Sequence, residues 1–484
     1  MKVLYVTSEA QPLVKTGGLA DVSGALPQAL KQRRVDVRLI LPAYRATVEA
    51  LGQVRVVGEI AGLDLPVRLL RGRLPGSEVP VWLVDCPPLF DRAGGPYSAP
   101  DGSDWPDNPE RFALFSRVAV RVALDTAGLH WRPDVVHCHD WQTGLVPALL
   151  DGHADRPRTV FTIHNLAYQG SYPHETFARL ALPDRLWSPE ALEFYGRLAL
   201  IKGGLAFADR LTTVSPTYAR EICTASHGQG FDGLLRHRSD VLTGILNGAD
   251  YAAWDPARDP RLAQPFGATT LPRRQRNKAA LQHAFGLPEE EVTPLVAHIG
   301  RLAWQKGGDL IAEALPEMLD TGVQFVLLGS GDPVLERRLV ALARRHPDRL
   351  AVRIGYDETL AHQIEGGADL FLMPSRYEPC GLNQIYSLRY GCVPVVRRTG
   401  GLADTVIDAT PHAVRGGIAT GVLFEEASPW AILEAVRRAL ALYRDRRRWR
   451  QVQRTGMAQD FSWDESAREY ARLYREVVQE AGER

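Results

Sequence analysis

The sequence has few cysteines and no excess of charge of either sign. Its five cysteines lie far apart in 484 residues and form no C-x-x-C pair. An odd, scattered set argues against a disulfide framework and against a structural zinc site. Lysine plus arginine equals aspartate plus glutamate at 57 each, so no overall field attracts nucleic acid. We therefore expect neither a disulfide-stabilised protein nor a nucleic-acid-binding one.

Long apolar runs are also missing. No stretch reaches the roughly 20 apolar residues that cross a bilayer, and the start of the chain lacks the apolar core and cleavage site of a signal peptide. We expect a cytoplasmic protein with no membrane contact. The basic run at 444–450 is expected to be the solvated face of a helix rather than a polyanion site.

Several nucleotide and metal motifs are absent too. The first glycine loop, at 15–18, matches neither G-x-x-x-x-G-K-[ST] nor G-x-G-x-x-G, which argues against a P-loop kinase and a nicotinamide dehydrogenase. There is no Asp-x-Asp pair to hold a metal-bound sugar nucleotide. His137-Cys138-His139-Asp140 has no further ligand cluster near it, so we expect no metal. An enzyme that acts on a sugar nucleotide without a metal would have to neutralise the leaving diphosphate with Arg, Lys and helix N-termini.

What the sequence does contain is an alternation of short apolar strands and amphipathic helices, in two successive series. This alternation predicts parallel sheets covered on both faces. In the first series we expect strands at 3–6, 37–41, 79–84, 135–137, 159–163 and 211–214, and helices at 19–30, 111–127 and 191–208. In the second we expect strands at 294–299, 324–328, 352–354, 370–373 and 393–396, and helices at 308–319 and from Pro333 onward.

The length is too great for one hydrophobic core, so we predict an α/β protein of two Rossmann-like, doubly wound domains facing a central cleft. The domains are expected at 1–248 and 249–460, with the C-terminal helix 461–484 packing back on the first. The stretch 250–276, rich in Pro, Arg and Asp, is predicted to be the linker and the entry to the second domain.

Three loops carry the candidate chemistry. Lys15 precedes two glycines and a helix, a setting in which exposed amides and a helix dipole favour an anion. Arg301 and Lys306 flank a turn directly after a strand, where both cations could reach a pyrophosphate. Glu378 follows the buried strand 370–373 and stands just before the amides that open the next helix.

An internal repeat links the two halves. The hexamer Thr-Gly-Gly-Leu-Ala-Asp at 16–21 recurs letter for letter at 399–404, each time before a helical pattern. We expect each copy to let the backbone approach a ligand closely.

Taken together, these motifs resemble one family, the bacterial glycogen synthases and plant starch synthases, which have the GT-B glycosyltransferase fold. The resemblance covers nearly the whole chain and rests on segments that keep the family's order: 15–21, 137–142, 164–165, 244–250, 300–307, 378–381 and 399–404. It implies retaining transfer of glucose from ADP-glucose to the non-reducing 4-hydroxyl of an α-1,4-glucan such as glycogen, without cofactor or metal. It is compatible with an oligomer.

The resemblance also implies roles for individual residues. The catalytic residues would be Arg301, Lys306, Glu378 and His164. The donor would be bound by Lys15, Gly17, Gly18, Tyr356, Cys380, Gly381, Leu382 and Asn383, with Tyr356 stacking on the nucleotide base. The acceptor side would comprise Asp21, Asp140, Trp141, Asn247 and Tyr97.

Two positions depart from the wider pattern. Asn383 stands where the family usually has Thr, which affects a side-chain contact but not the backbone amide. Tyr386 stands where many other GT-B enzymes carry a second Glu, and this absence is typical of the synthases. Alternatives are a GT-B enzyme that uses UDP-glucose or a small acceptor such as glucose 1-phosphate, and a catalytically inactive glucan-binding protein. The retained cations argue against the inactive protein. A phosphorylase would need a longer chain and a lysine-bound pyridoxal phosphate.

Overall fold

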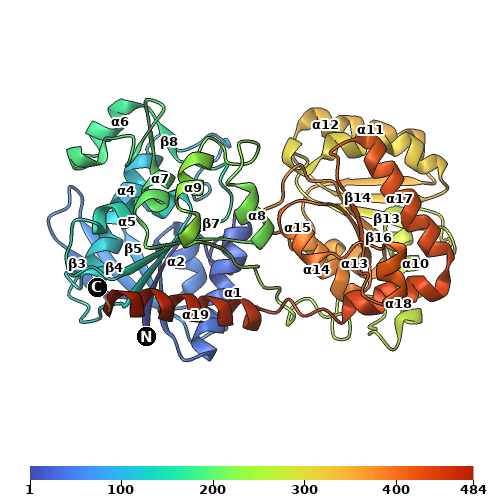
Figure 1. The fold of residues 1–484 in the computed structure, drawn as a ribbon, viewed down its shortest axis with the longest axis horizontal. Coiled ribbons are helices and arrows are strands. Elements are labelled where there is room, and N and C mark those ends of the chain that lie inside the picture. The colour runs from blue at the N-terminus through green and yellow to red at the C-terminus, as the bar shows by residue number, and fades with distance from the viewer. Residues whose placement is uncertain (483–484) are drawn as a thin grey trace. The chain divides into compact units, whose positions relative to one another are not determined.

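The computed structural model describes residues 1–482, which fold into two compact units. Unit 1 contains residues 1–214, 219–248 and the C-terminal helix that begins at Trp463, and unit 2 contains 215–218 and 249–462. Both units are α/β (Figure 1). Within the described residues, no helix combines the length and the apolar character needed to cross a membrane.

The main sheet of unit 1 has nine strands in the order β12-β11-β7-β6-β1-β2-β5-β4-β3. All neighbours are parallel except the pairs β5–β4 and β4–β3. Its strands are β1 (Lys2–Val6), β2 (Asp36–Pro42), β3 (Arg55–Ile60), β4 (Val67–Arg73), β5 (Pro80–Asp85), β6 (Val135–His139), β7 (Arg158–Ile163), β11 (Arg210–Thr213) and β12 (Leu242–Gly244). A small antiparallel sheet consists of β8 (Ser171–Tyr172), β9 (Glu193–Phe194) and β10 (Arg197–Ala199).

Helices cover both faces of the nine-stranded sheet (Figure 1). The helices of unit 1 are α1 (Gly18–Gln32), α2 (Arg45–Leu51), α3 (Pro87–Phe90), α4 (Asn108–Ala123), α5 (Leu145–Leu150), α6 (His174–Arg179), α7 (Leu200–Phe207), α8 (Pro216–Glu221, whose first residues belong to unit 2), α9 (Asp232–His237) and α19 (Trp463–Gly482). α1 and α19 lie side by side, and their apolar faces share one core cluster with β1, β2 and β5. A second apolar cluster joins α4, α5 and α7.

The sheet of unit 2 is parallel, with six strands in the order β15-β14-β13-β16-β17-β18. These are β13 (Leu295–Ile299), β14 (Gln324–Gly329), β15 (Leu350–Ile354), β16 (Leu370–Met373), β17 (Val393–Arg397) and β18 (Val422–Phe424). The helices are α10 (Arg274–Phe285), α11 (Gly308–Asp320), α12 (Pro333–Arg345), α13 (Glu358–Gly367), α14 (Asn383–Tyr390), α15 (Gly400–Thr405), α16 (Pro411–Arg415), α17 (Pro429–Arg444) and α18 (Arg446–Met457). Single 3-10 turns in the chain lie at Trp141–Thr143, Asp184–Leu186, Ser239–Val241, Leu271–Arg273 and Trp304–Lys306.

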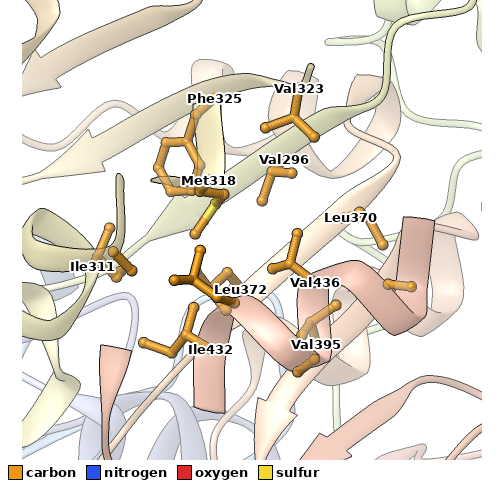
Figure 2. Packing of buried hydrophobic residues seen from close by; sticks show 14 of the residues in the cluster. Val296, Ile311, Met318, Val323, Phe325, Leu370, Leu372, Val395, Ile432 and Val436 are labelled. Atoms are coloured by element: carbon orange, nitrogen blue, oxygen red, sulfur yellow. The ribbon is translucent and has the colours of Figure 1, made fainter. Parts of the chain in front are cut away.

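Apolar side chains from the strands of unit 2 meet those of α11 and α17 on one face of the sheet (Figure 2). Leu372 of β16, for example, is fully buried and shares this cluster with Met318 of α11 and Ile432 of α17. The other face is covered by α10, α13 and α15. The continuous apolar runs of these strands are typical of parallel strands buried on both sides.

The strand order of each sheet reverses at one place. In unit 1 the chain runs from β1 outward through β2 and returns at β6 on the other side of β1; in unit 2 it returns at β16 beside β13. Ligands of open α/β sheets bind beyond the carboxyl ends of the strands at such a switch point. The candidate ligand-binding residues are therefore those that follow β1, β6 and β7 in unit 1, and β13 and β16 in unit 2.

The helix expected at 191–208 is wrong over its first half. Residues 193–199 form the hairpin β9–β10, and helix α7 begins only at Leu200. Tyr195 and Gly196 have φ values of 49° and 76°, the successive positive angles of a tight hairpin turn. The apolar residues on either side of this turn had the spacing of a helical face.

The segment 250–276 belongs to unit 2, as expected for the entry to the second domain, but it is packed against that unit rather than being a free linker. The Trp254 ring stacks between His362 of α13 (centroids 3.6 Å apart) and Tyr386 of α14 (4.1 Å apart). Asp259, which is 2% exposed, accepts a 2.6 Å hydrogen bond from the Tyr390 hydroxyl and pairs with Nδ1 of His362 at 2.7 Å. Composition suggested a linker, but one tryptophan and one buried carboxylate attach the segment to unit 2.

Truncating the buried face of α19 should destabilise unit 1. Leu473 is 6% exposed in the core shared with α1, so Leu473→Ala is expected to lower the free energy of unfolding by about 2–5 kcal/mol. Arg472→Ala, at a side chain that is 68% exposed on the same helix, should change it by less than about 0.5 kcal/mol. Urea unfolding monitored by circular dichroism measures both. Equal midpoints for the two variants would contradict the packing of α19 on unit 1.

Candidate functional site

The glycine loop of unit 1 leads from the end of β1 into α1. Gly17 stands at the N-cap of α1, and a Cβ atom placed at Gly17 or Gly18 would meet nothing within 4 Å. Lys15 Nζ lies 2.6 Å from Asp21 Oδ1 in the first turn of the helix, and both side chains are partly exposed. The loop is thus open to close approach by a ligand, and its cation is paired with the acidic residue of the same motif.

Glu9, which the sequence analysis missed, holds this loop from inside. Its Oε2 accepts hydrogen bonds from the amides of Thr16 and Gly17 (2.5 and 3.1 Å), and its Oε1 accepts one from the Tyr97 hydroxyl (2.6 Å). The residue is 3% exposed, and burial raises the pKa of its carboxyl against the lowering effect of these hydrogen bonds. The Gly17 amide, expected to face a phosphate, therefore already donates to a carboxylate. Its position just after β1 was the signal that could have identified Glu9.

Two histidines meet at the carboxyl ends of β6 and β7. His139 Nδ1 lies 3.0 Å from His164 Nε2, and His139 also stacks on Tyr5 with ring centroids 4.2 Å apart. Burial lowers the pKa of His164 to about 3 and that of His139 well below its ordinary value. Both rings are therefore neutral at physiological pH, and the ring of His164, the predicted donor-sugar contact, is hydrogen-bonded to a histidine.

Asp140 fixes the backbone of His164. Its Oδ1 accepts a 2.8 Å hydrogen bond from the His164 amide, and its own φ of 55° lies in the left-handed region. Asp140 is 7% exposed, and burial raises its pKa to about 7, against the opposing hydrogen bonds of the His164 and Asn165 amides. The predicted acceptor-side carboxylate thus also orders the turn that carries His164.

The remaining acceptor-side residues of unit 1 lie in two groups. The Tyr97 and Trp141 rings are 6.2 Å apart, and the Tyr97 hydroxyl also contacts Ser8 Oγ at 2.7 Å. Asn247 is 8% exposed, and its Oδ1 has no hydrogen-bond partner among the described residues. Tyr97 therefore joins the Glu9 network, whereas the side-chain oxygen of Asn247 is buried without a partner among the described residues.

In unit 2 the structure brings Lys306 and Glu378 together. Lys306 Nζ lies 2.6 Å from Glu378 Oε2, which also accepts a 2.9 Å hydrogen bond from Ser375 Oγ. Glu378 is 4% exposed, so its charge needs this pairing. His298 of β13 lies near the pair, and burial lowers its pKa to about 4. Ser375 and His298 were not predicted; both belong to strands, or directly follow strands, that flank the switch point.

Close backbone packing between two loops explains this pair. Gly307 has a φ of 71°, and a Cβ atom there would lie 2.4 Å from the Pro374 carbonyl oxygen. The Arg376 amide donates a 2.8 Å hydrogen bond to the Gln305 carbonyl. Arg301 lies at the start of the same turn and donates to Gln305 Oε1 at 3.4 Å. Only glycine at 307 lets the turn with the two cations approach the loop with Glu378.

The N-terminus of α14 faces the same end of the sheet. Leu382 stands at the N-cap and makes no side-chain cap hydrogen bond, so first-turn amides remain available to an anion. Asn383 Nδ2 donates a 3.0 Å hydrogen bond to the Ile299 carbonyl at the end of β13. Cys380 and Gly381 precede this turn, and Cys380 is 5% exposed. The Asn that departs from the family pattern thus ties α14 to β13.

Tyr356 lies away from this turn, on an open pocket after β15. It is 78% exposed, and the pocket is lined by Arg353, Ile354, Tyr356, Asp357, Thr359 and Gln363, among others. An exposed ring at the rim of a pocket offers a stacking surface. Its expected contact with a nucleotide base stays a prediction.

The second copy of the repeated hexamer has a different role from the first. A Cβ atom at Gly400 would lie within 1.9 Å of the Glu378 carbonyl oxygen, and the Gly401 amide donates to that oxygen at 3.1 Å. Asp404 accepts hydrogen bonds from the Thr217 amide and hydroxyl, both 2.7 Å. At 399–404 the glycines therefore pack against the loop of Glu378, and their expected approach to a ligand stays a prediction.

Among residues 1–482 there is no group of three or more His, Cys, Asp or Glu side chains arranged to hold a metal ion. The five cysteines, all of which lie in the described part of the chain, are free. Each unit instead contains a cation beside a carboxylate: Lys15 pairs with Asp21 in unit 1, and Lys306 pairs with Glu378 in unit 2.

Comparison with known proteins shows which family this chain resembles. The family described as starch synthase catalytic domain matches residues 2–237, and the family described as glycosyl transferases group 1 matches residues 282–455. The chain is 56% identical to a glycogen synthase of Thioalkalivibrio sulfidiphilus, covering 99% of this chain and 100% of that protein. It is 57% identical to glycogen synthase 1 of Methylococcus capsulatus, covering 99% and 97%.

A solved structure agrees with these sequence matches. The catalytic domain of starch synthase IV from Arabidopsis thaliana, bound to ADP and acarbose, superposes with a TM-score of 0.87 at 35% identity, covering 99% of each chain.

Two Rossmann-like units in one chain, each with polar loops at its switch point, define a glycosyltransferase of the GT-B fold. Within that class, the chain belongs to the glycogen synthase family.

The raised pKa of Asp140 predicts a pH-dependent stability. The folded protein holds this proton up to about pH 7, whereas an unfolded aspartate releases it near pH 4, so Asp140 makes folding less favourable as the pH rises between these values. Asp140→Asn cannot ionise. The free energy of unfolding of Asp140→Asn minus that of wild type should therefore be larger at pH 8 than at pH 5, by on the order of 1–3 kcal/mol in urea unfolding.

Asp209 is the matched control, because its shift has the opposite sign. Burial alone would raise its pKa, but Arg156 and Thr159 lower it to about 2. Its stabilising contribution is lost only as the pH falls from about 4 to 2. The effect of Asp209→Asn should therefore be the same at pH 5 and pH 8, and a flat difference for Asp140→Asn as well would show that Asp140 is ionised throughout.

Proposed function

We propose that this enzyme transfers glucose from ADP-glucose to the non-reducing 4-hydroxyl of an α-1,4-glucan, with retention of the anomeric configuration. The observation that carries the proposal is the Lys306–Glu378 pair beside the N-terminus of α14, because it combines a phosphate-binding cation with a carboxylate for sugar hydroxyls. The glycogen synthases that align along the full chain, and the ADP-bound starch synthase, support the choice of donor and acceptor.

In this proposal unit 2 binds the nucleotide sugar. Arg301, Lys306 and the amides of Leu382 and Asn383 hold the diphosphate, and Tyr356 stacks on the adenine. Glu378 accepts hydrogen bonds from hydroxyls of the glucose. The exposed Tyr356 ring and the uncapped first turn of α14 support these roles.

To unit 1 we assign the acceptor residues and three further donor-binding residues. Lys15 and Gly18 bind the diphosphate, and His164 contacts the glucose. The glucan lies along Asp21, Asp140, Asn247, Tyr97 and Trp141. Support comes from the open backbone at Gly18 and from the acceptor oxygen of Asn247.

The reaction proposed is a front-face displacement. The bond between the anomeric carbon and the β-phosphate oxygen breaks, the acceptor O4 bonds to the same face of that carbon, and the O4 proton passes to the departing ADP. Arg301 and Lys306 stabilise the charge that grows on the diphosphate. A covalent intermediate would need a free carboxylate, whereas Glu378 is buried against Lys306 and Ser375.

The proposal is tested by incubating the purified protein with ADP-glucose and glycogen. We expect ADP release and chain extension in equal amounts, α-linked product by NMR, and no loss of activity after EDTA treatment. UDP-glucose in competition should be a poorer donor, and glucose 1-phosphate a poor acceptor. ADP release without extension, or stronger transfer from UDP-glucose, would contradict the stated substrates.

Removing the Lys306 cation should act mainly on turnover. Lys306→Ala is expected to lower kcat by about 10²–10³-fold, because the charge it neutralises develops only as ADP departs. Arg344→Ala, which removes an exposed cation of α12 in the same unit, should leave kcat within about twofold. An increase in KM for ADP-glucose at unchanged kcat would instead assign Lys306 to ground-state binding alone.

A further inference from the structure

The hydrogen bond between His139 and His164 depends on the tautomers of the two rings. His139 is fully buried at the end of β6, and its Nδ1 lies 3.0 Å from His164 Nε2. Its other ring nitrogen, Nε2, has no hydrogen-bond partner among the described residues. Since both rings are neutral, one of the two facing nitrogens carries a proton and donates it to the other. Either His139 or His164 is therefore the donor.

The burial of His139 Nε2 shows which of the two rings is the donor. If His164 donated, the neutral His139 would carry its own proton on Nε2, which would be a buried N–H without an acceptor. If His139 donates from Nδ1, only a lone pair is left unpaired at that position. Orphaned buried N–H groups are the rarer and costlier defect. His139 is therefore the donor, and His164 carries its proton on Nδ1.

We propose that His139 is a positioning residue of the transfer reaction, which fixes the tautomer of His164 so that Nδ1–H is presented to the donor sugar. The inference rests on the proposed function, since it takes His164 as the glucose contact. A neutral donor N–H can bind a hydroxyl oxygen of the glucose without adding positive charge beside the anomeric carbon, where positive charge develops during transfer.

The surroundings of the two rings are consistent with a fixed, neutral pair. His137 and Tyr5 pack on His139 with ring centroids 4.1 and 4.2 Å away, and neither brings a formal charge. The His139 amide is bound to Thr143 Oγ1 at 2.6 Å, and the His164 amide to Asp140 at 2.8 Å. Both backbones are thus restrained independently of the ring-to-ring hydrogen bond, so changing that bond alone is a local perturbation.

Two substitutions separate the donated proton from packing. His139→Leu and His139→Asn both remove the ring and leave side chains of similar size, but only Asn retains an N–H donor near the place of Nδ1. We expect His139→Leu to lower kcat about tenfold, the effect of one ordinary hydrogen bond, with KM for glycogen unchanged. His139→Asn should recover kcat to within about threefold of wild type.

Tyr474→Phe provides the control. The Tyr474 hydroxyl lies 2.7 Å from Nδ1 of His137, the adjacent buried histidine, which does not bond to His164. This variant removes a comparable buried hydrogen bond and should keep kcat within about twofold of wild type. A tenfold loss there would mean that any disturbance of the buried histidines has the same effect, and would overturn a specific role for His139.

The tautomer itself can be observed without activity. In protein labelled with 15N-histidine, the ring resonances missing from His164→Gln belong to residue 164. We expect a protonated Nδ1 and a bare Nε2 in wild type and in His139→Asn. A protonated Nε2 in wild type would overturn the inference, even if His139→Leu failed to fold, and so would equal kcat values for His139→Leu and His139→Asn.

This design separates the inference from the proposed function. If wild type does not extend glycogen from ADP-glucose, the proposed function fails, whereas the NMR result still decides the tautomer. If wild type is active and the tautomer is reversed, the proposed function stands and the inference fails.

Discussion

In each unit the carboxyl ends of the parallel strands lie at one edge of the sheet. The strand order reverses at one point along that edge, between β1 and β6 in unit 1 and between β13 and β16 in unit 2. Several polar residues of the candidate sites depend on this constraint. Glu9, His139 and His164 follow or end β1, β6 and β7, while Arg301 and Ser375 follow β13 and β16. Parallel pairing brings residues more than a hundred positions apart to adjacent strand ends, and the crossover helices leave that edge open.

At these edges the charges are satisfied in local pairs. Lys15 pairs with Asp21, Lys306 pairs with Glu378, and Glu9 accepts the amides of the glycine loop. Such pairs orient their side chains at little electrostatic cost, since a buried carboxylate left without a partner would be strongly unfavourable. In each unit the cation of the candidate site is therefore already held in position by a carboxylate.

The repeated hexamer shows how far tertiary context governs function. At 16–21 its glycines face open space at the start of α1; at 399–404 they pack against the carbonyls of Glu378 and Cys380. The letters are identical, but in the second copy the neighbouring loop occupies the space that a Cβ atom would fill. A motif in one sequence predicts what a backbone can do, and the packing around it decides whether that ability is used.

The sequence by itself determined the α/β class, the two series of strands, the loops with Lys15, Lys306 and Glu378, and the family, because apolar periodicity and glycine placement are local properties. It did not reveal the β9–β10 hairpin, whose apolar residues have the spacing of a helical face, or the attachment of 250–276 through Trp254. The partners of Glu9, the His139–His164 contact and the brace at Gly400 were decided only by the tertiary structure. Each joins residues on different strands or loops, and which of these become neighbours depends on strand order and register, which no single segment encodes.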